Sequence, residues 1–200
     1  MPFKEGPPIP APEVDFRWLT NLRSEEHCGP FQLGRSLGFV VPSPIDVAID
    51  ALDEIQFRGT PTDAGKFAID NGIVEVWQRD GGYIGFKKHT FLKRYEFRVD
   101  DHWECMFIPN GKNTIEWRLG FDANVTGNFG LLVAPPPDPV PNIEIPYGYL
   151  SASALQRMTN GSGFSIAIKP LESTHIARGT PLARLIPLPS ELFKITLEIS

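Results

Sequence analysis

The sharpest candidate for chemistry in this sequence is a set of two histidines and one carboxylate. His102 and Glu104 are separated by one residue, and His175 follows much later in the chain. Residues i and i+2 of a β-strand point to the same face, so a strand at this position would present His102 and Glu104 together. Two histidines and one carboxylate on one face form the ligand set that holds non-haem Fe(II) in oxygenases.

The same residues resemble the iron site of the double-stranded β-helix oxygenases, with Glu104 in the place where that family usually has aspartate. In those enzymes a basic residue beyond the distal histidine holds the carboxylate of a 2-oxo acid. Arg184 follows His175 at the matching place in this chain. The resemblance implies a 2-oxo-acid-dependent oxygenase, which we keep as the alternative function.

Strand alternation also argues against a closed metal site at this position. Trp103, Cys105 and Phe107 share the opposite face, which is the expected core side. His102 and Glu104 are then expected to face solvent. We therefore assign no catalytic, cofactor-binding or metal-binding residue from the sequence, and we expect no cofactor.

Nucleophilic catalysis has less support than the metal site. No Gly-x-Ser-x-Gly motif is present, and the two cysteines, Cys28 and Cys105, lack the spacing of a redox or zinc pair. His27 directly precedes Cys28, and adjacent strand residues point to opposite faces, which is poor geometry for an activated thiol. We therefore favour a non-enzymatic protein over an enzyme.

Composition argues against several classes of partner. The chain has 19 Lys and Arg against 24 Asp and Glu, and the net charge of -5 does not suit general binding of nucleic acid. No apolar run approaches the ~20 residues of a membrane span, and the N-terminus lacks the apolar segment of a signal peptide. We expect no membrane partner and no secretion. One basic cluster is expected to face solvent along a strand, and it consists of Lys87, Lys88, Lys93, Arg94 and Arg98.

Short apolar strands separated by Gly and Pro dominate the pattern. Alternating apolar residues predict strands, and residues 80–82 and 109–111 predict turns because Gly and Asn tolerate positive φ. This pattern predicts an all-β protein, a single-domain β-sandwich or barrel with a jelly-roll-like arrangement. The expected strands are residues 37–41, 45–49, 55–57, 72–77, 83–86, 91–99, 103–108, 114–119, 164–168, 182–186 and 193–199.

Prolines predict both a terminal arm and an internal loop. Residues 1–14 are expected to form an extended arm, because each Pro removes a backbone donor and disfavours helix in the residue before it. A short helix or turn is expected near residues 15–27, where apolar residues approach helical spacing. The proline-rich segment 134–141 predicts a stiff polyproline loop within one domain of residues 15–200.

Aromatic residues leave two interpretations open. Trp103 and Trp117 each alternate with apolar neighbours, which predicts burial in a β core. An exposed aromatic row on one sheet face would instead bind carbohydrate or another ligand by stacking. We keep a ligand-binding or carbohydrate-binding β module as a further alternative.

Several short motifs occur in a fixed order along the chain. Trp18 precedes a Gly-aromatic strand within residues 28–39, and the strands 163–168 and 178–187 precede Glu191. These landmarks, the Gly-Thr-Pro-Leu-Ala run above all, resemble an uncharacterised family of β-rich bacterial and phage proteins. The resemblance implies a β architecture and a viral context. It carries over no catalytic residue, because that family has no established activity.

The leading prediction is a non-enzymatic structural or interaction protein that self-associates or docks onto other structural proteins. A capsid, decoration or accessory component of a phage virion is the expected form, located in the cytoplasm or in the assembled virion. The arm of residues 1–14 and the last strand at 193–199 are suited to gripping neighbouring subunits. Deleting residues 1–14 or 192–200 should weaken assembly while leaving the core folded.

Overall fold

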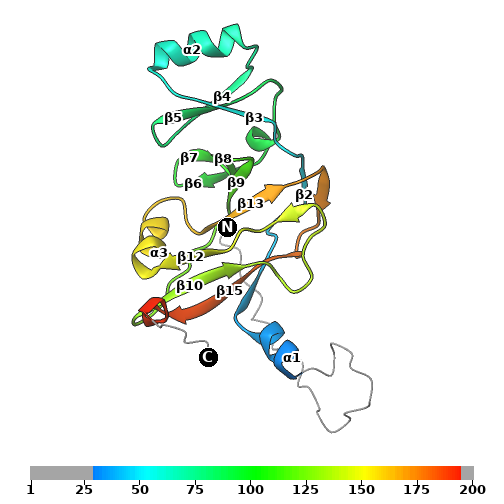
Figure 1. Cartoon of the computed structure of the whole chain (residues 1–200), viewed down its shortest axis with the longest axis vertical. Helices are drawn as coiled ribbons and strands as arrows, with labels where there is room; N and C mark the ends of the chain where they lie inside the picture. The colour runs from blue at the N-terminus through cyan, green and yellow to red at the C-terminus, as the bar shows by residue number, and fades with distance from the viewer. Residues whose placement is uncertain (1–28, 195–200) are drawn as a thin grey trace, which may run out of the picture.

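The computed structural model describes residues 29–194, which form several antiparallel sheets accompanied by short helices (Figure 1). The helices are α1 (Gly29–Ser36), α2 (Pro61–Asp70), η3 (Leu92–Arg94), α3 (Ala152–Thr159) and η4 (Ser190–Lys194), of which η3 and η4 are 3-10 helices. The strands are β1 (Phe39–Pro42), β2 (Val47–Ile49), β3 (Glu54–Phe57), β4 (Glu75–Arg79), β5 (Gly82–Phe86), β6 (Glu96–Val99), β7 (His102–Cys105), β8 (Phe107–Gly111), β9 (Thr114–Arg118), β10 (Phe129–Ala134), β11 (Ile143–Glu144), β12 (Gly148–Ser151), β13 (Ser165–Pro170), β14 (Thr174–Ile176) and β15 (Pro181–Pro189).

Two four-stranded sheets form the body of the protein. The strand order is β1-β15-β10-β12 in the first sheet and β11-β13-β9-β8 in the second, and every pair is antiparallel. Within the described residues neither sheet closes into a barrel, so the arrangement is sandwich-like and the all-β prediction is confirmed. The prediction of one domain over residues 15–200 extends beyond the described range and stays a prediction.

One cluster of buried apolar side chains joins the two sheets. Ile115 and Trp117 on β9 face Ile168 and Ile166 on β13 across the strand pair, and all four are buried. Phe107 on β8 packs on Trp117 with ring centroids 5.0 Å apart. The first sheet contributes Leu131, Val133, Ala183 and Leu185. Because polar or small residues occupy the alternate positions of β9 and β13, each of these strands has one core face and one outer face.

A smaller layer at one end of the molecule consists of the sheet β3-β5-β4 covered by α2 (Figure 1). The rings of Phe57 on β3 and Phe67 on α2 stack with centroids 4.6 Å apart, and Ala64 and Ala68 of the helix are buried. The opposite face of this sheet carries Ile84, which belongs to the main core. The small sheet is therefore packed between α2 and the body.

The strands predicted within residues 28–39 and 91–99 are wrong in part, because residues 29–36 form α1 and residues 92–94 form η3. The sequence prediction also missed α2 and α3, although the start of each of these two helices is encoded locally. At α2 the Thr60 hydroxyl accepts from the Asp63 N–H, and the Asp63 carboxylate accepts from the Thr60 N–H at 3.2 Å. This reciprocal pair is a capping box, and Pro61 follows at a position where a missing donor is harmless. At α3 the Ser151 hydroxyl accepts from the Ala154 N–H. The spacing of these residues was the signal for both helices.

The turn predicted at residues 80–82 is confirmed. Asp80 and Gly81 have φ angles of 39° and 76° and connect β4 to β5. Positive φ at both central residues matches the twist of the flanking strands, which is why Asp-Gly is favoured in two-residue hairpins.

The turn predicted at residues 109–111 is wrong, because the turn lies later in the chain. Lys112 and Asn113 are the central turn residues, with φ angles of 54° and 57°. Gly111 belongs to β8 and pairs with Thr114 next to a register irregularity, where its own φ is 89°. The positive φ of Gly111 is therefore required at the bulge, and Gly111 is not a central residue of the turn.

Predictions for the chain ends have mixed outcomes. The arm at residues 1–14 and the helix or turn at 15–27 lie outside the described residues. The strand predicted at 193–199 is wrong at its start, because Ser190–Lys194 is a 3-10 helix, and the remainder lies outside the described residues. The segment 134–141 begins with the last residue of β10 and then continues as a loop without regular structure, as predicted.

Candidate functional site

Two of the three predicted metal ligands lie together, and the third lies elsewhere. On β7, Nε2 of His102 is 3.0 Å from Oε1 of Glu104. His175 is an exposed residue of β14, which pairs with β2. Arg184, predicted to hold a 2-oxo acid, donates instead to the carbonyl oxygen of Gly34 at 2.5 Å. In the part of the chain that the structure describes, no three His, Cys, Asp or Glu side chains are grouped for a metal ion, so the predicted triad is not assembled.

The orientation predicted for residues 102–107 is confirmed at His102, which is exposed, and at Phe107, which is buried, but it is wrong at Trp103 and Glu104. Trp103 is 66% exposed, whereas the side chain of Glu104 is 23% exposed. The structure pairs β7 with β6 in a two-stranded sheet beside the main sheets, so Trp103 has no core face to pack on. Glu104 turns toward Arg118 on β9, and this charge pairing decides the orientation. Trp117, the other tryptophan predicted in the core, is fully buried as expected.

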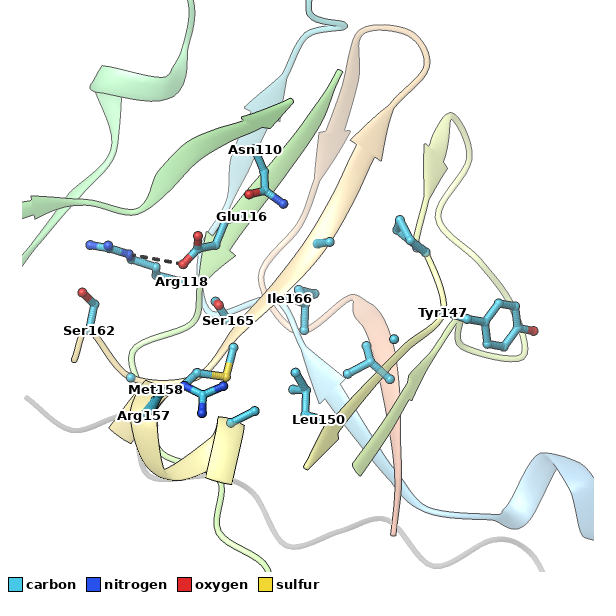
Figure 2. Close-up of a pocket in the computed structure, with 16 residues that line it drawn as sticks. Asn110, Glu116, Arg118, Tyr147, Leu150, Arg157, Met158, Ser162, Ser165 and Ile166 are labelled. Carbon is cyan, nitrogen blue, oxygen red and sulfur yellow. Dashed lines mark ion pairs between the residues drawn. The ribbon is translucent and has the colours of Figure 1, made fainter. Parts of the chain in front are cut away.

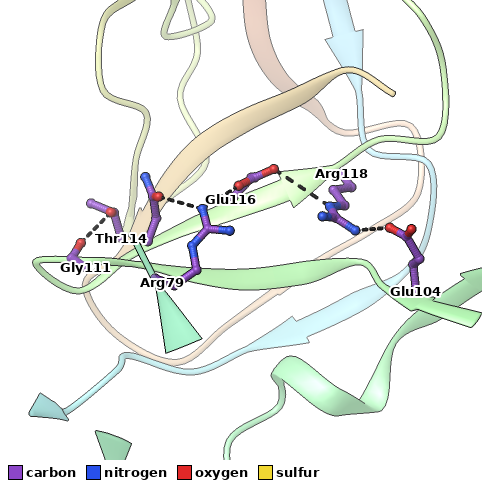
Figure 3. Close-up of polar contacts among 7 residues, drawn as sticks. Arg79, Glu104, Gly111, Thr114, Glu116 and Arg118 are labelled. Atoms are coloured by element: carbon purple, nitrogen blue, oxygen red, sulfur yellow. Dashed lines mark hydrogen bonds and ion pairs between the residues drawn. The ribbon is translucent and has the colours of Figure 1, made fainter. Parts of the chain in front are cut away.

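A row of alternating charges crosses β4, β9 and β7 (Figure 3). Arg79 donates to Glu116 at 2.9 Å, and Nε of Arg118 lies 3.8 Å from the other oxygen of the same carboxylate. Arg118 also pairs with Glu104, which contacts His102. We call these five residues the charge ladder. Each carboxylate lies between two positive or hydrogen-bonding groups, so the charges of Glu104 and Glu116 are balanced within the charge ladder.

The environment of Glu104 keeps this residue ionised. A hydrogen bond from Ser162 is the main cause that holds the pKa of Glu104 below its ordinary value, and His102 and the Arg118 charge act in the same direction against desolvation. The neighbouring Cys105 behaves differently, because burial raises the pKa of its thiol. Cys105 is therefore a protonated, weakly nucleophilic side chain at neutral pH.

The charge ladder borders a cavity of about 530 Å³ that is lined by residues of both main sheets (Figure 2). One wall comes from β9 and β13, the other from β10 and β12, and α3 lies at one end. We call this cavity the α3 pocket. Its apolar wall contains Val133, Leu150, Met158 and Ile166. Tyr147 stands at the rim, 75% exposed, and its ring points away from the pocket (Figure 2).

Strand register explains why polar groups reach this pocket. On β13, Ser165 lies opposite Arg118, and Ala167 lies opposite Glu116. Cross-strand partners point to the same face, so these residues share the outer face of the β9–β13 pair. Ser162 and Arg157 complete the polar lining from the loop after α3 and from α3 itself.

A second candidate surface lies at α1 and β1. α1 contains no buried residue, and Leu33, Leu37, Phe39 and Val40 are all exposed. We call these four residues the α1–β1 surface. β1 is the terminal strand of its sheet in the described structure, and a groove of about 450 Å³ lies beside it. An apolar sheet edge of this kind is suited to a protein partner.

Exposed aromatic side chains are scattered over the described residues. They lie on β1, α2, β7, β10 and the loop before β12, and they are Phe39, Phe67, Trp103, Phe129 and Tyr147. No row on one sheet face, as a stacking carbohydrate site would need, is formed among residues 29–194.

The five basic residues predicted to face solvent are exposed, but they do not lie on one strand. Lys87 and Lys88 follow β5, Lys93 and Arg94 belong to η3, and Arg98 lies on β6. Their charges are therefore spread over three parts of the surface. None of the helices between residues 29 and 194 combines the length and the apolar character that crossing a membrane requires.

Comparisons of the chain with protein-family models, with curated proteins and with solved structures each find no match. The motif resemblance at residues 28–39 and 178–187 stays a prediction. Function must therefore be inferred from the surfaces and pockets of the protein itself.

Part of the site was visible in the sequence. Within Thr114–Arg118, Glu116 and Arg118 are two residues apart and out of phase with the buried residues of the strand. That pattern predicts two charges on one outer face. It does not identify Arg79 or Glu104 as their partners, because these come from other strands and only the tertiary structure brings them near.

Proposed function

We propose that this protein is a non-enzymatic structural or interaction protein that self-associates through the α1–β1 surface. The observation that carries the proposal is that α1 buries none of its residues while exposing Leu33 at 66%. Helices of globular proteins normally bury one apolar face. An unburied helix next to an apolar sheet edge therefore suits an interface.

Two polar contacts within residues 29–194 hold α1. Arg35 forms an ion pair of 2.7 Å with Asp138, and Arg184 on β15 donates to the carbonyl of Gly34. These contacts orient the helix while leaving its apolar side chains available. A second copy of the chain presents the same residues, so two α1–β1 surfaces can cover each other around a two-fold axis.

A capsid, decoration or accessory protein of a phage virion is the specific form of this proposal. Its support is the resemblance of the ordered motifs, and the self-association proposal does not depend on it. A virion component acts through interfaces with copies of itself, which agrees with an exposed apolar helix and edge strand.

Sedimentation velocity of a double variant tests the proposal. Leu33→Glu with Val40→Glu places two charges on the α1–β1 surface, and both positions are exposed, so the fold should be retained. We expect the wild-type chain to sediment as an oligomer and the double variant as a monomer. Ile69→Glu is the matched control, because Ile69 is 81% exposed on α2 at the other end of the molecule (Figure 1). A monomeric wild type, or an oligomer unchanged by the double variant, would contradict the proposal.

Truncation tests the chain ends separately. Removing residues 1–14 or 192–200 is expected to weaken the oligomer if these segments reach neighbouring subunits. An oligomer unaffected by both truncations but lost in the double variant would assign assembly to the α1–β1 surface alone.

A further inference from the structure

The α3 pocket contains a positive charge that none of residues 29–194 neutralises. Arg157 is an exposed residue in the last turn of α3 that lines the pocket, and its guanidinium forms no hydrogen bond or ion pair with any of residues 29–194. The other charged lining residues, Glu116 and Arg118, are compensated within the charge ladder. Within the described part of the chain the pocket therefore carries one unpaired guanidinium, and Figure 2 shows it beside Met158 at the α3 end.

Further hydrogen-bond donors line the same pocket without a partner. Ser165 is 7% exposed, and its hydroxyl has no hydrogen bond among the described residues. Nε of Arg118 is buried and also lacks a hydrogen-bond partner. A buried donor such as Nε of Arg118 is normally satisfied by protein, water or ligand. Donors grouped near an unpaired cation favour an anionic acceptor.

Another part of the pocket lining is apolar. Leu150, Met158 and Ile166 contribute side chains from β12, α3 and β13, and Val133 adds another from β10. Met158 is an unbranched side chain that can adjust to different ligand shapes. The volume of about 530 Å³ lies within the range of small-molecule sites.

We propose that the α3 pocket binds a small organic anion, with its carboxylate on Arg157 and the Ser165 hydroxyl and its apolar body against Leu150, Met158 and Ile166. The partner class is a carboxylic acid with a short apolar chain or ring. This site is independent of the α1–β1 surface, so binding is expected whether or not the protein self-associates.

Fluorine NMR with a matched pair of probes tests the proposal. The acid is 4-(4-fluorophenyl)butyrate, and the neutral partner is 4-(4-fluorophenyl)butan-1-ol, which has the same apolar body. Line broadening of the probe signal reports binding to a protein of any oligomeric state. We expect saturable binding of the acid and at least about tenfold weaker binding of the alcohol, the difference that one charge-assisted contact provides.

Two variants locate the site. Arg157→Gln is expected to weaken binding of the acid at least about tenfold and to leave binding of the alcohol unchanged. Ser165→Ala should weaken binding of the acid by a smaller factor, since it removes one neutral donor. Arg58→Gln is the control, because Arg58 is exposed and does not line the α3 pocket. Equal binding of acid and alcohol, no saturable binding of the acid, or an acid affinity unchanged by Arg157→Gln would each overturn the proposal.

Discussion

The indole Nε1 of Trp77 donates a hydrogen bond of 2.6 Å to Oε1 of Glu75, two residues earlier on the same face of β4. Glu75 is only 3% exposed, and its carboxylate also accepts from the N–H and the hydroxyl of Thr90, each at 2.9 Å. Three donors thus replace the water that a buried carboxylate loses. The contact ties the small sheet layer to the segment that leads into η3.

Replacing Glu75 with Gln is expected to destabilise the protein by about 2–3 kcal/mol. The amide nitrogen cannot accept a hydrogen bond, so at least one donor from Trp77 or Thr90 loses its acceptor. Urea denaturation measures the free energy of unfolding. Glu144→Gln is the control, because Glu144 forms an exposed 3.4 Å ion pair with Lys169 and its loss should cost less than about 1 kcal/mol. Equal losses of unfolding free energy in the two variants would show that the buried hydrogen bonds of Glu75 stabilise the fold no more than an exposed ion pair does.

The stability difference between wild type and Glu75→Gln should depend on pH. Burial alone raises the pKa of Glu75, but hydrogen bonds from Thr90 and Trp77 and the charge of Lys93 outweigh it and lower the pKa below the ordinary value. A lowered folded-state pKa stabilises the fold above the unfolded-state pKa, and this stabilisation is lost as pH falls through the folded-state pKa. The difference should therefore be constant near neutral pH and shrink in acid. Urea titrations at several pH values check this, and a difference that grows in acid would contradict the assignment.

The Arg79–Glu116 pair should show measurable coupling in a double-mutant cycle. The two side chains are each 27% exposed, and they join β4 of the small layer to β9 of the body. We expect a coupling free energy of about 1 kcal/mol from unfolding of Arg79→Ala, Glu116→Ala and the double variant. Arg98 and Asp101 form the control pair, because both are largely exposed and their coupling should be close to zero. A similar coupling for both cycles would contradict a role for the ladder in joining the layers.

Two glycine substitutions should have opposite effects. A Cβ on Gly130 of β10 would lie 2.6 Å from the carbonyl oxygen of Leu150 and would also collide with the phenol of Tyr149. Gly130→Ala is therefore expected to cost about 2 kcal/mol or more. Gly65→Ala, in the middle of α2 with open space around the new methyl group, should stabilise the protein by about 0.5–1 kcal/mol. Thermal unfolding of both variants measures the difference, and a neutral Gly130→Ala would show that β12 can move away from β10.

Two tryptophan substitutions distinguish the structure from the sequence pattern. Trp117 is fully buried, so Trp117→Ala is expected to cost about 3–5 kcal/mol. Trp103 is mostly exposed, and Trp103→Ala should change stability by no more than about 0.5 kcal/mol. Acrylamide quenching in single-tryptophan variants gives a second measurement, with strong quenching expected for Trp103 and little for Trp117. Comparable stability losses in Trp103→Ala and Trp117→Ala would contradict the exposed position of Trp103 and support the core position that alternation predicted.

Local patterns were enough to predict the class of fold and much of its core. Alternation over Thr114–Arg118 predicts a strand with one buried face, and Asp80 with Gly81 predicts a hairpin, because side-chain direction and allowed φ are properties of neighbouring residues. The capping residues Thr60 and Ser151 carried the same kind of local information for α2 and α3, although no helix was predicted from them.

What the sequence by itself determined is therefore a set of short antiparallel strands with assigned apolar faces. The tertiary structure alone decided which strands pair: β1 joins β15 from the far end of the chain, and Glu104 meets Arg118 because β7 lies outside the main sheets. It also decided that Arg157 and Ser165 line one cavity. The physical reason is that strand pairing and pocket formation depend on the packing free energy of the whole core. Alternation shows only which side chains of one strand share a face.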